Sequence, residues 1–77
     1  LEPRLNLVKV REVNRRIERL GGLNMGQRGS HRKYKVTVDG TTVSTVVPQH
    51  AGRDIPIGTL SAIQRDLEPA LGKGWLS

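Results

Sequence analysis

The sequence of 77 residues contains no cysteine and no phenylalanine, and Tyr34 and Trp75 are its only aromatic side chains apart from two histidines. Without cysteine the chain forms no disulfide and offers no thiolate to a metal. Two histidines alone are too few ligands for a zinc site, so we expect no metal and no cofactor. Two aromatic rings also argue against a module that binds nucleic acid by stacking several bases on such rings.

Long hydrophobic runs are absent as well. No stretch of the sequence approaches the roughly eighteen consecutive apolar residues of a membrane-spanning helix, and the first residues lack the apolar block of a secretion signal. We therefore expect a cytoplasmic protein with no membrane partner. The length suits one small domain over residues 1–77 with a single core and no second lobe. Functional residues should consequently lie on its surface.

Positive charge is concentrated in the first half of the chain. Residues 1–35 hold ten Lys and Arg against three Asp and Glu, a balance of +7, whereas residues 36–77 hold three against four, a balance of −1. Such asymmetry favours a polyanionic partner, which is a nucleic acid, an anionic membrane or an acidic protein. The alternative is a basic surface that only keeps the protein soluble.

Apolar residues at helical spacing predict two helices. The first helix should cover residues 7–20, with Asn6 as N-cap and Gly21-Gly22 at its end, and its apolar stripe is Val10, Val13, Ile17 and Leu20. Arginines fall opposite this stripe, where they face phosphates or simply water: Arg11, Arg15 and Arg19. The second helix carries Leu60, Ile63 and Leu67, and Pro69 should stop or bend it near Leu67.

Three strands are predicted between the helices, over residues 23–28, 31–38 and 41–47, the last closed by Pro48. Alternation in the middle strand is strict. One face carries Tyr34, Val36 and Val38, and the other carries His31, Lys33, Lys35 and Thr37. Asp39-Gly40 is a strong signal for a tight turn between two strands.

The order α-β-β-β-α predicts an α+β fold, in which two helices cover one face of a three-stranded antiparallel sheet. This is the layout of the double-stranded-RNA-binding fold, which includes binding modules and nucleases, so the fold alone does not settle the function. Residues 72–77 should form a flexible, loosely held tail, with Trp75 folded back onto the core.

The tripeptide Gly29-Ser30-His31 combines three features useful for RNA chemistry. The glycine lets backbone approach a phosphate, the serine donates a hydroxyl, and the imidazole transfers protons near neutral pH. Scission of RNA by transesterification needs a base for the 2′-hydroxyl proton, a role for His31, and positive charge from Arg32, Lys33 or Lys35. A histidine at a turn is also an ordinary surface residue, so the tripeptide alone leaves catalysis open.

Two further positions carry alternatives of the same kind. His50 is either a second catalytic group or a structural hydrogen-bonding residue. Gly58-Thr59, at the start of the second helix, either binds phosphate through free amide groups or serves as a cap.

Read together, the segments RGSHRKY and TVVPQHAGRDIPIGTLSAIQRDL, preceded by a helix that ends in Gly-Gly, resemble the HicA family of bacterial toxins, which are partners of HicB antitoxins. The resemblance covers a core of about residues 8–68. It implies a double-stranded-RNA-binding-like fold and a ribosome-independent mRNA interferase whose catalytic histidine falls on His31. The other shared motif positions are Val47, Pro48, His50, Pro56, Gly58, Thr59, Leu60 and Ile63. Family members commonly carry an aromatic residue after the first helix, where this chain has Gly22-Leu23, and residues 71–77 match no part of the family pattern.

We therefore predict an RNA endonuclease toxin that uses His31 as general acid or base to cleave mRNA and arrest translation. The predicted RNA-binding residues are Arg28, Gly29, Ser30, Arg32, Lys33 and Lys35, with His50, Gly58 and Thr59 as secondary candidates. An acidic HicB-type antitoxin should cover His31. The alternatives are a non-catalytic RNA- or DNA-binding module, and an adaptor whose basic helix docks an acidic protein.

Overall fold

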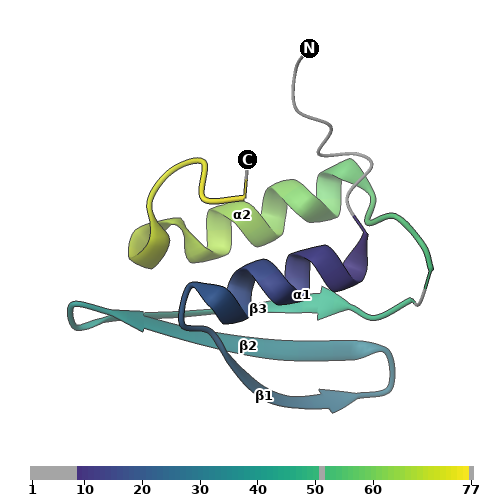
Figure 1. Ribbon diagram of the computed structural model, residues 1–77, viewed down its shortest axis with the longest axis horizontal. Helices are drawn as coiled ribbons and strands as arrows, with labels where there is room; N and C mark the ends of the chain where they lie inside the picture. Colours follow the sequence, from purple (N-terminus) through teal and green to yellow (C-terminus); the bar gives the residue numbers. More distant parts are fainter. Residues whose placement is uncertain (1–8, 51, 77) are drawn as a thin grey trace.

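The computed structural model describes residues 9–50 and 52–76. Along the chain they form α1 (Val10–Arg19), β1 (Leu23–Arg28), β2 (His31–Val38), β3 (Thr41–Pro48) and α2 (Ile57–Leu71). The strands make one antiparallel sheet in the order β1-β2-β3. Both helices lie on the same face of this sheet (Figure 1). The predicted α+β fold is confirmed.

Tight turns connect the three strands. Gly29, the first of two residues between β1 and β2, has a φ of +59°, a left-handed conformation that suits glycine. Both residues of the Asp39-Gly40 turn also have positive φ, +50° and +82°. The predicted bounds of β1 and β2 are confirmed, and β3 continues one residue further, to Pro48.

The alternation of β2 divides its side chains between the core and solvent. Tyr34 and Val36 are fully buried beneath the helices, and Val38 is partly buried. The odd-numbered residues of the strand are all exposed on the opposite face: His31, Lys33, Lys35 and Thr37. The sheet therefore has a helix-covered face and an open face, and His31 belongs to the open face.

Helix α1 begins later than the sequence suggested. Its N-cap is Lys9, whose backbone N–H donates to Glu12 Oε1 at 3.2 Å. Asn6, the predicted cap, lies outside the described residues. At the other end, Gly21 N–H donates to Glu18 O and Gly22 N–H donates to Ile17 O, the paired bonds of a Schellman motif.

Leu20 is the C-cap of α1 and is 41% exposed, so its prediction as part of the buried stripe is wrong. The chain has already left the helix at this residue, and the side chain no longer follows the helical spacing. Val10, Val13 and Ile17 are buried as predicted.

Helix α2 continues through Pro69 to Leu71, which corrects the predicted stop near Leu67. A proline so close to the end removes only one helical hydrogen bond. The last turn is held by the bond from Gly72 N–H to Glu68 O at 2.7 Å and by packing of Ala70 and Leu71 against the core. Tertiary contacts thus outweigh the local preference.

The C-terminal residues contribute to the core. Trp75 is folded back onto the core as predicted, and Leu76 is buried as well, although a loosely held tail was expected for residues 72–77. The Trp75 indole N–H donates to Gln64 O at 2.8 Å, and Arg16 Nε donates to Trp75 O at 3.1 Å. Trp75 therefore bridges α1 and α2.

Replacing Gly22 with alanine should destabilise the protein. An added Cβ would lie 2.3 Å from Ile17 Cγ2 and 2.8 Å from Ile17 O, so the buried end of α1 would have to move. We expect the free energy of unfolding, measured by urea denaturation, to fall by about 2 kcal/mol or more, the scale of a strained or overpacked core position.

Gly58 provides the matched control, because a Cβ there meets nothing within 4 Å. It lies in α2, where alanine is favoured over glycine, so Gly58→Ala should stabilise the protein by about 0.5–1 kcal/mol. Equal effects of the two substitutions would contradict the packing described around Gly22.

Candidate functional site

His31 is the first residue of β2 and directly follows the Gly29-Ser30 turn. Across the sheet it pairs with Arg28 of β1 on one side and with Pro48 of β3 on the other. Its side chain is exposed on the open face. An imidazole in this position is accessible to a substrate from solvent.

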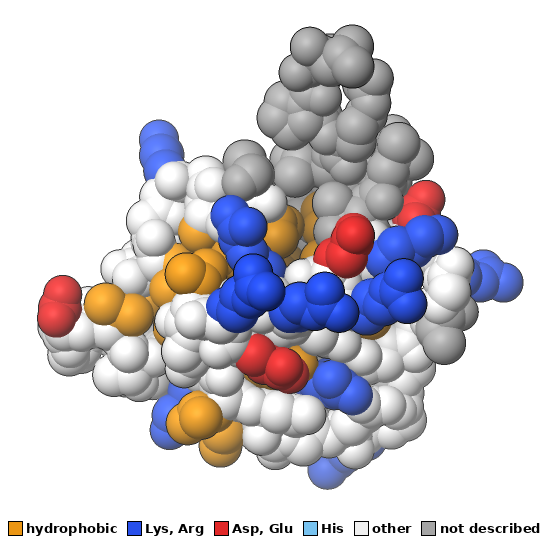
Figure 2. All heavy atoms as spheres, viewed as in Figure 1, with side chains coloured by type: hydrophobic (Ala, Val, Ile, Leu, Met, Phe, Trp, Pro, Cys, Tyr) orange, Lys and Arg blue, Asp and Glu red, His pale blue; other side chains and the backbone are white. Residues whose placement is uncertain are grey.

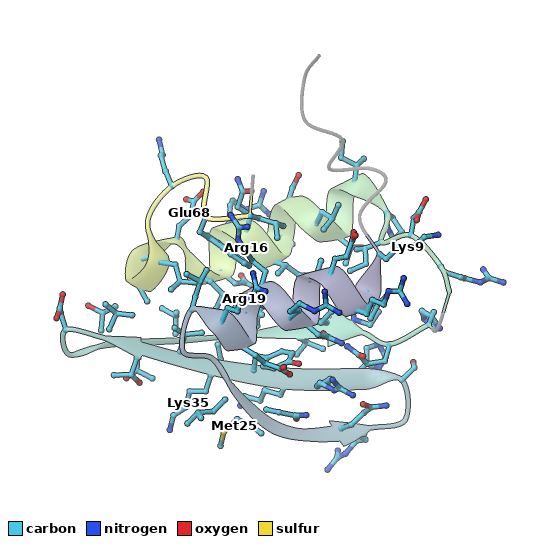
Figure 3. All side chains as sticks on the ribbon, viewed as in Figure 1. Lys9, Arg16, Arg19, Met25, Lys35 and Glu68 are labelled. Carbon is cyan, nitrogen blue, oxygen red and sulfur yellow. The ribbon has the colours of Figure 1, made fainter. Side chains whose placement is uncertain are left out.

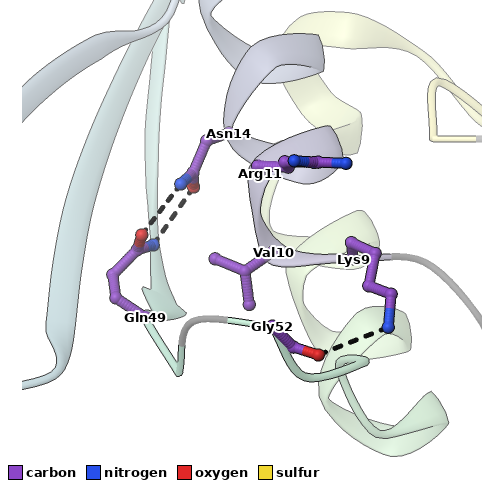
Figure 4. Close-up of a pocket in the computed structure, with 6 residues that line it drawn as sticks. All are labelled: Lys9, Val10, Arg11, Asn14, Gln49 and Gly52. Atoms are coloured by element: carbon purple, nitrogen blue, oxygen red, sulfur yellow. Dashed lines mark hydrogen bonds between the residues drawn. The ribbon is translucent and has the colours of Figure 1, made fainter.

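The turn before His31 is attached to the rest of the fold through Gln49. The backbone N–H of Gln49 donates to Ser30 O at 2.6 Å. Its side-chain amide forms two reciprocal hydrogen bonds with Asn14 of α1, at 2.8 and 3.1 Å (Figure 4). The start of β2 is thereby connected to the end of β3 and to α1. Sequence patterns carry no signal for this pair, because its members lie 35 residues apart and neither belongs to an apolar stripe.

A cavity of about 480 Å³ lies beside this amide pair (Figure 4). Its described lining residues are Lys9, Val10, Arg11, Asn14, Gln49 and Gly52. Lys9 Nζ is occupied by Asp54 at 2.9 Å and by Gly52 O at 3.3 Å. Among the described lining residues, Arg11 is then the cation that remains for an anionic ligand.

The predicted RNA-binding cations divide between the two faces of the sheet. Arg28, Lys33 and Lys35 are exposed and share the open face with His31, according to the strand register. Arg32 projects to the helix-covered face instead. Its Nε donates to Gln27 Oε1 at 3.1 Å and its terminal nitrogen donates to Tyr34 Oη at 3.3 Å. The alternation of β2 already contained this information, since Arg32 falls between two residues of the open face.

Arg32 belongs to a polar network beneath the sheet. Tyr34 Oη donates to Glu18 Oε2 at 2.6 Å and accepts from Arg32, so the network joins α1, β1 and β2. Burial raises the pKa of the Tyr34 hydroxyl, and the hydrogen bond to Glu18 raises it further, while Arg32 opposes the shift. The phenol therefore keeps its proton, and its bond to Glu18, at a higher pH than an ordinary tyrosine would.

The secondary candidates belong to segments other than β2. His50 is exposed, two residues after β3 ends. Gly58 and Thr59 lie in the first turn of α2, whose N-cap is Pro56 without a side-chain cap bond, so neither residue is the cap. The β1–β2 turn, the end of β3 and the N-terminal ends of both helices nevertheless lie at one end of the molecule (Figure 1).

The outward arginines of α1 form a second cationic region. Arg11, Arg15 and Arg19 are exposed, as predicted, and follow one another at four-residue intervals. This spacing corresponds to about 6 Å along the helix axis between neighbours. Lys and Arg side chains make a band across α1 in the space-filling view (Figure 2). We call Arg11, Arg15 and Arg19 the α1 arginine row.

Comparison of the chain with known protein families shows which family it resembles. A family model described as the HicA toxin of bacterial toxin–antitoxin systems matches residues 10–68. The chain belongs to the HicA toxin family. The matched part of this HicA toxin begins with α1, includes His31 and His50, and ends at Glu68, three residues before the end of α2.

No curated protein and no solved structure is significantly similar to the chain. Within residues 9–50 and 52–76, no helix of this HicA toxin is long and apolar enough to cross a membrane.

Replacing Tyr34 with phenylalanine should loosen the link between α1 and β2. The substitution keeps the buried ring and removes the hydroxyl that bonds to Glu18, so we expect a loss of about 1 kcal/mol in the free energy of unfolding near neutral pH. The raised pKa adds a second effect. Above the ordinary tyrosine pKa of 10.0 the unfolded chain ionises first, so the native protein loses stability as pH rises, and the variant lacks this contribution.

Urea denaturation from neutral pH to about pH 11 measures both effects, and the difference between native protein and variant isolates Tyr34 from the titrating lysines. Thr37→Val is the control, because Thr37 lies on β2 like Tyr34 and the substitution removes only its exposed hydroxyl bond to Thr42 of β3. Its effect should be small and independent of pH. A Tyr34→Phe variant as stable as the native protein at neutral pH would contradict the structural role of the network.

Proposed function

We propose that this HicA toxin is an endoribonuclease that cleaves mRNA in the cytoplasm, with His31 as its proton-transfer group. The observation that carries the proposal is the solvent-exposed imidazole of His31, at a glycine turn among cations, in a chain of the HicA family. A buried ring would have left only a basic domain. The open face therefore supports a nuclease better than a passive surface.

The chemistry we propose is transesterification within the RNA chain. His31 removes the proton from a ribose 2′-hydroxyl, and the 2′-oxygen attacks the adjacent phosphorus. The bond from phosphorus to the 5′-oxygen breaks, the leaving oxygen takes up a proton from water, His31 returns its proton to water, and a 2′,3′-cyclic phosphate remains. Arg28, opposite His31, and Lys33, two residues along the same face, supply positive charge to the phosphorane. On this proposal the Ser30 hydroxyl and the backbone N–H groups of the Gly29-Ser30 turn contact the phosphate, since the carbonyl oxygens of the turn already accept from Gln27 and Gln49.

Electrostatics at this end of the molecule favour a polyanion. The N-terminal ends of α1 and α2 carry partial positive charge, and both lie at the same end as the β1–β2 turn (Figure 1). Arg11 begins the α1 arginine row near that end. We propose that the RNA strand passes over the turn and along this row, with His50, Gly58 and Thr59 as further phosphate contacts near the start of α2.

Control of such an enzyme follows from its small size. A single domain has no cleft that closes over the substrate, so access to His31 is most simply blocked from outside. We propose that a cognate HicB-type antitoxin covers His31 and carries acidic side chains where it meets the cations of the open face.

Replacing His31 with alanine should abolish RNA cleavage and leave RNA affinity nearly unchanged. General acid–base catalysis is commonly worth about 10² to 10⁴-fold, so the rate constant for cleavage should fall by at least a hundredfold on that scale. The measurement is a single-turnover assay on a labelled RNA, with binding measured separately on a non-cleavable RNA that carries 2′-deoxyribose at the cut position.

His50→Ala is the comparison variant: it removes the other imidazole, a proposed phosphate contact, so it should weaken RNA affinity while cleavage of bound RNA continues. Cleavage of the deoxyribose substrate would rule out the 2′-hydroxyl mechanism. Loss of RNA affinity in His31→Ala, in parallel with cleavage, would favour the non-catalytic binding module.

Replacing Arg11, Arg15 and Arg19 with glutamine should reduce the salt dependence of RNA binding. Three lost phosphate contacts lower the slope of log K against log salt by about 2 for a single strand. The double variant Arg65→Gln, Lys73→Gln removes exposed charges of α2 and the following residues and should change the slope much less. An unchanged slope in the triple variant would show that the row does not contact phosphates.

A further inference from the structure

The open face of the sheet exposes a group of apolar side chains. Of the large hydrophobic residues that are exposed in the described part of the chain, three lie on β1 and β3: Leu23 at 60%, Met25 at 50% and Val46 at 47%. Both helices cover the other face (Figure 1). Isolated exposed apolar residues need no explanation, but several on one face of a sheet indicate an interaction surface.

The strand register brings these residues to the lysines of β2. Lys35 pairs with Leu23 on one side and with Ser44 on the other, and Lys33 pairs with Val46. Side chains of directly paired residues lie about 4.5–5.5 Å apart at Cβ. Met25 lies in the irregular part of β1, between Asn24 and Gln27, and its side chain projects with that of Lys35 away from the helices (Figure 3). We call Leu23, Met25, Lys33, Lys35 and Val46 the open-face patch.

The chemistry of the open-face patch fits a protein better than RNA. Bases bind to exposed faces by stacking on aromatic rings, but Tyr34 is fully buried and Trp75 is 6% exposed, both within the core. Aliphatic side chains also gain nothing from phosphates. Aliphatic side chains on the outer strands β1 and β3, with the two lysines of β2 between them, instead suit a protein partner, which can bury the aliphatic groups and pair the charges.

Charge limits the partner further. The patch contains two lysines and no acid, and the next residues along this face, Arg28 and His31, add no negative charge. A partner that covers it must bring acidic groups to Lys33 and Lys35, because like charges would repel it, and apolar groups to the three aliphatic side chains.

We propose that the open-face patch is the docking surface of the acidic antitoxin, with Leu23, Met25 and Val46 as its anchors. This inference rests on the proposed function, which assigns an antitoxin to the His31 face. It separates two roles on that face. The aliphatic residues provide affinity for the partner and take no part in cleavage, while the partner blocks His31 because His31 is the next exposed residue of β2 beyond Lys33.

The test is a triple variant, Leu23→Thr, Met25→Thr, Val46→Thr. Threonine retains the strand preference of these positions and removes most of the apolar surface. Ile57→Thr is the matched control, because Ile57 is 57% exposed on α2, away from the sheet. Titration calorimetry measures the affinity of each variant for the purified HicB-type antitoxin encoded with this toxin, and the labelled-RNA assay measures cleavage.

We expect the triple variant to bind the antitoxin at least about tenfold more weakly, as for the loss of apolar anchors in an interface. It should cleave RNA at a rate within about twofold of the native rate, since no removed group contacts the reacting atoms. Antitoxin should inhibit the variant only at correspondingly higher concentration. Val46→Thr alone should show a smaller loss of antitoxin affinity. This single variant replaces the triple variant in the test if circular dichroism shows that the triple variant is unfolded.

Unchanged antitoxin affinity in a folded triple variant would overturn the proposal. So would a fall in RNA affinity with antitoxin affinity unchanged, because the patch would then be part of the RNA path. The proposed nuclease function fails separately, if the native toxin leaves RNA intact while it still binds the antitoxin.

Discussion

The alternation of side chains along β2 is the constraint on which the rest of the structure depends. Tyr34 and Val36 must be buried, because the two helices can cover only one face of the sheet and need apolar surface there. Once they point inward, His31, Lys33 and Lys35 point outward, since neighbouring residues of a strand face opposite sides. A slip of one residue in register would bury lysines and expose the core. The same arrangement of β2 therefore forms the core on one face of the sheet and the candidate site on the other.

A domain of this size leaves one sheet face without a layer above it, and that face carries the proposed chemistry. The imidazole of His31 then needs support from within the sheet and from the other side. Gln49 supplies one connection, because its backbone N–H donates to Ser30 O in the turn before His31 and its side-chain amide pairs with Asn14. The Tyr34–Glu18 bond supplies another, from the strand to α1. The backbone that carries the exposed imidazole is thereby held in place, so the group is accessible at a defined position of the fold. The same uncovered face is the natural place for an inhibitor.

Local patterns predicted most of the fold because its elements follow them closely. The three strands alternate or end at glycine turns, and Gly21-Gly22 ends α1 with two characteristic hydrogen bonds. The failures occur where tertiary packing opposes a local preference. Pro69 does not stop α2, because its last turn packs against the core, and Leu76 is buried in a segment that was expected to be loosely held. Ile55, in the segment before α2, is buried by tertiary packing as well. It belongs to no apolar stripe at helical or strand spacing, so the sequence did not predict its burial.

Periodicity and turn residues act over a few positions, so they were enough to predict the element order, the alternation of β2 and His31 as the candidate group. The surroundings of His31 follow instead from contacts between distant parts of the chain. The Asn14–Gln49 pair joins residues far apart in the chain, Arg32 found its partners on β1 and β2, and Leu23, Met25 and Val46 became neighbours of the lysines through strand pairing and an irregular stretch of β1. The two-residue turns set most of the strand pairing, but the irregular stretch of β1 and the side-chain partners of Arg32 and Gln49 depend on how the sheet packs beneath its helices, which no local pattern contains.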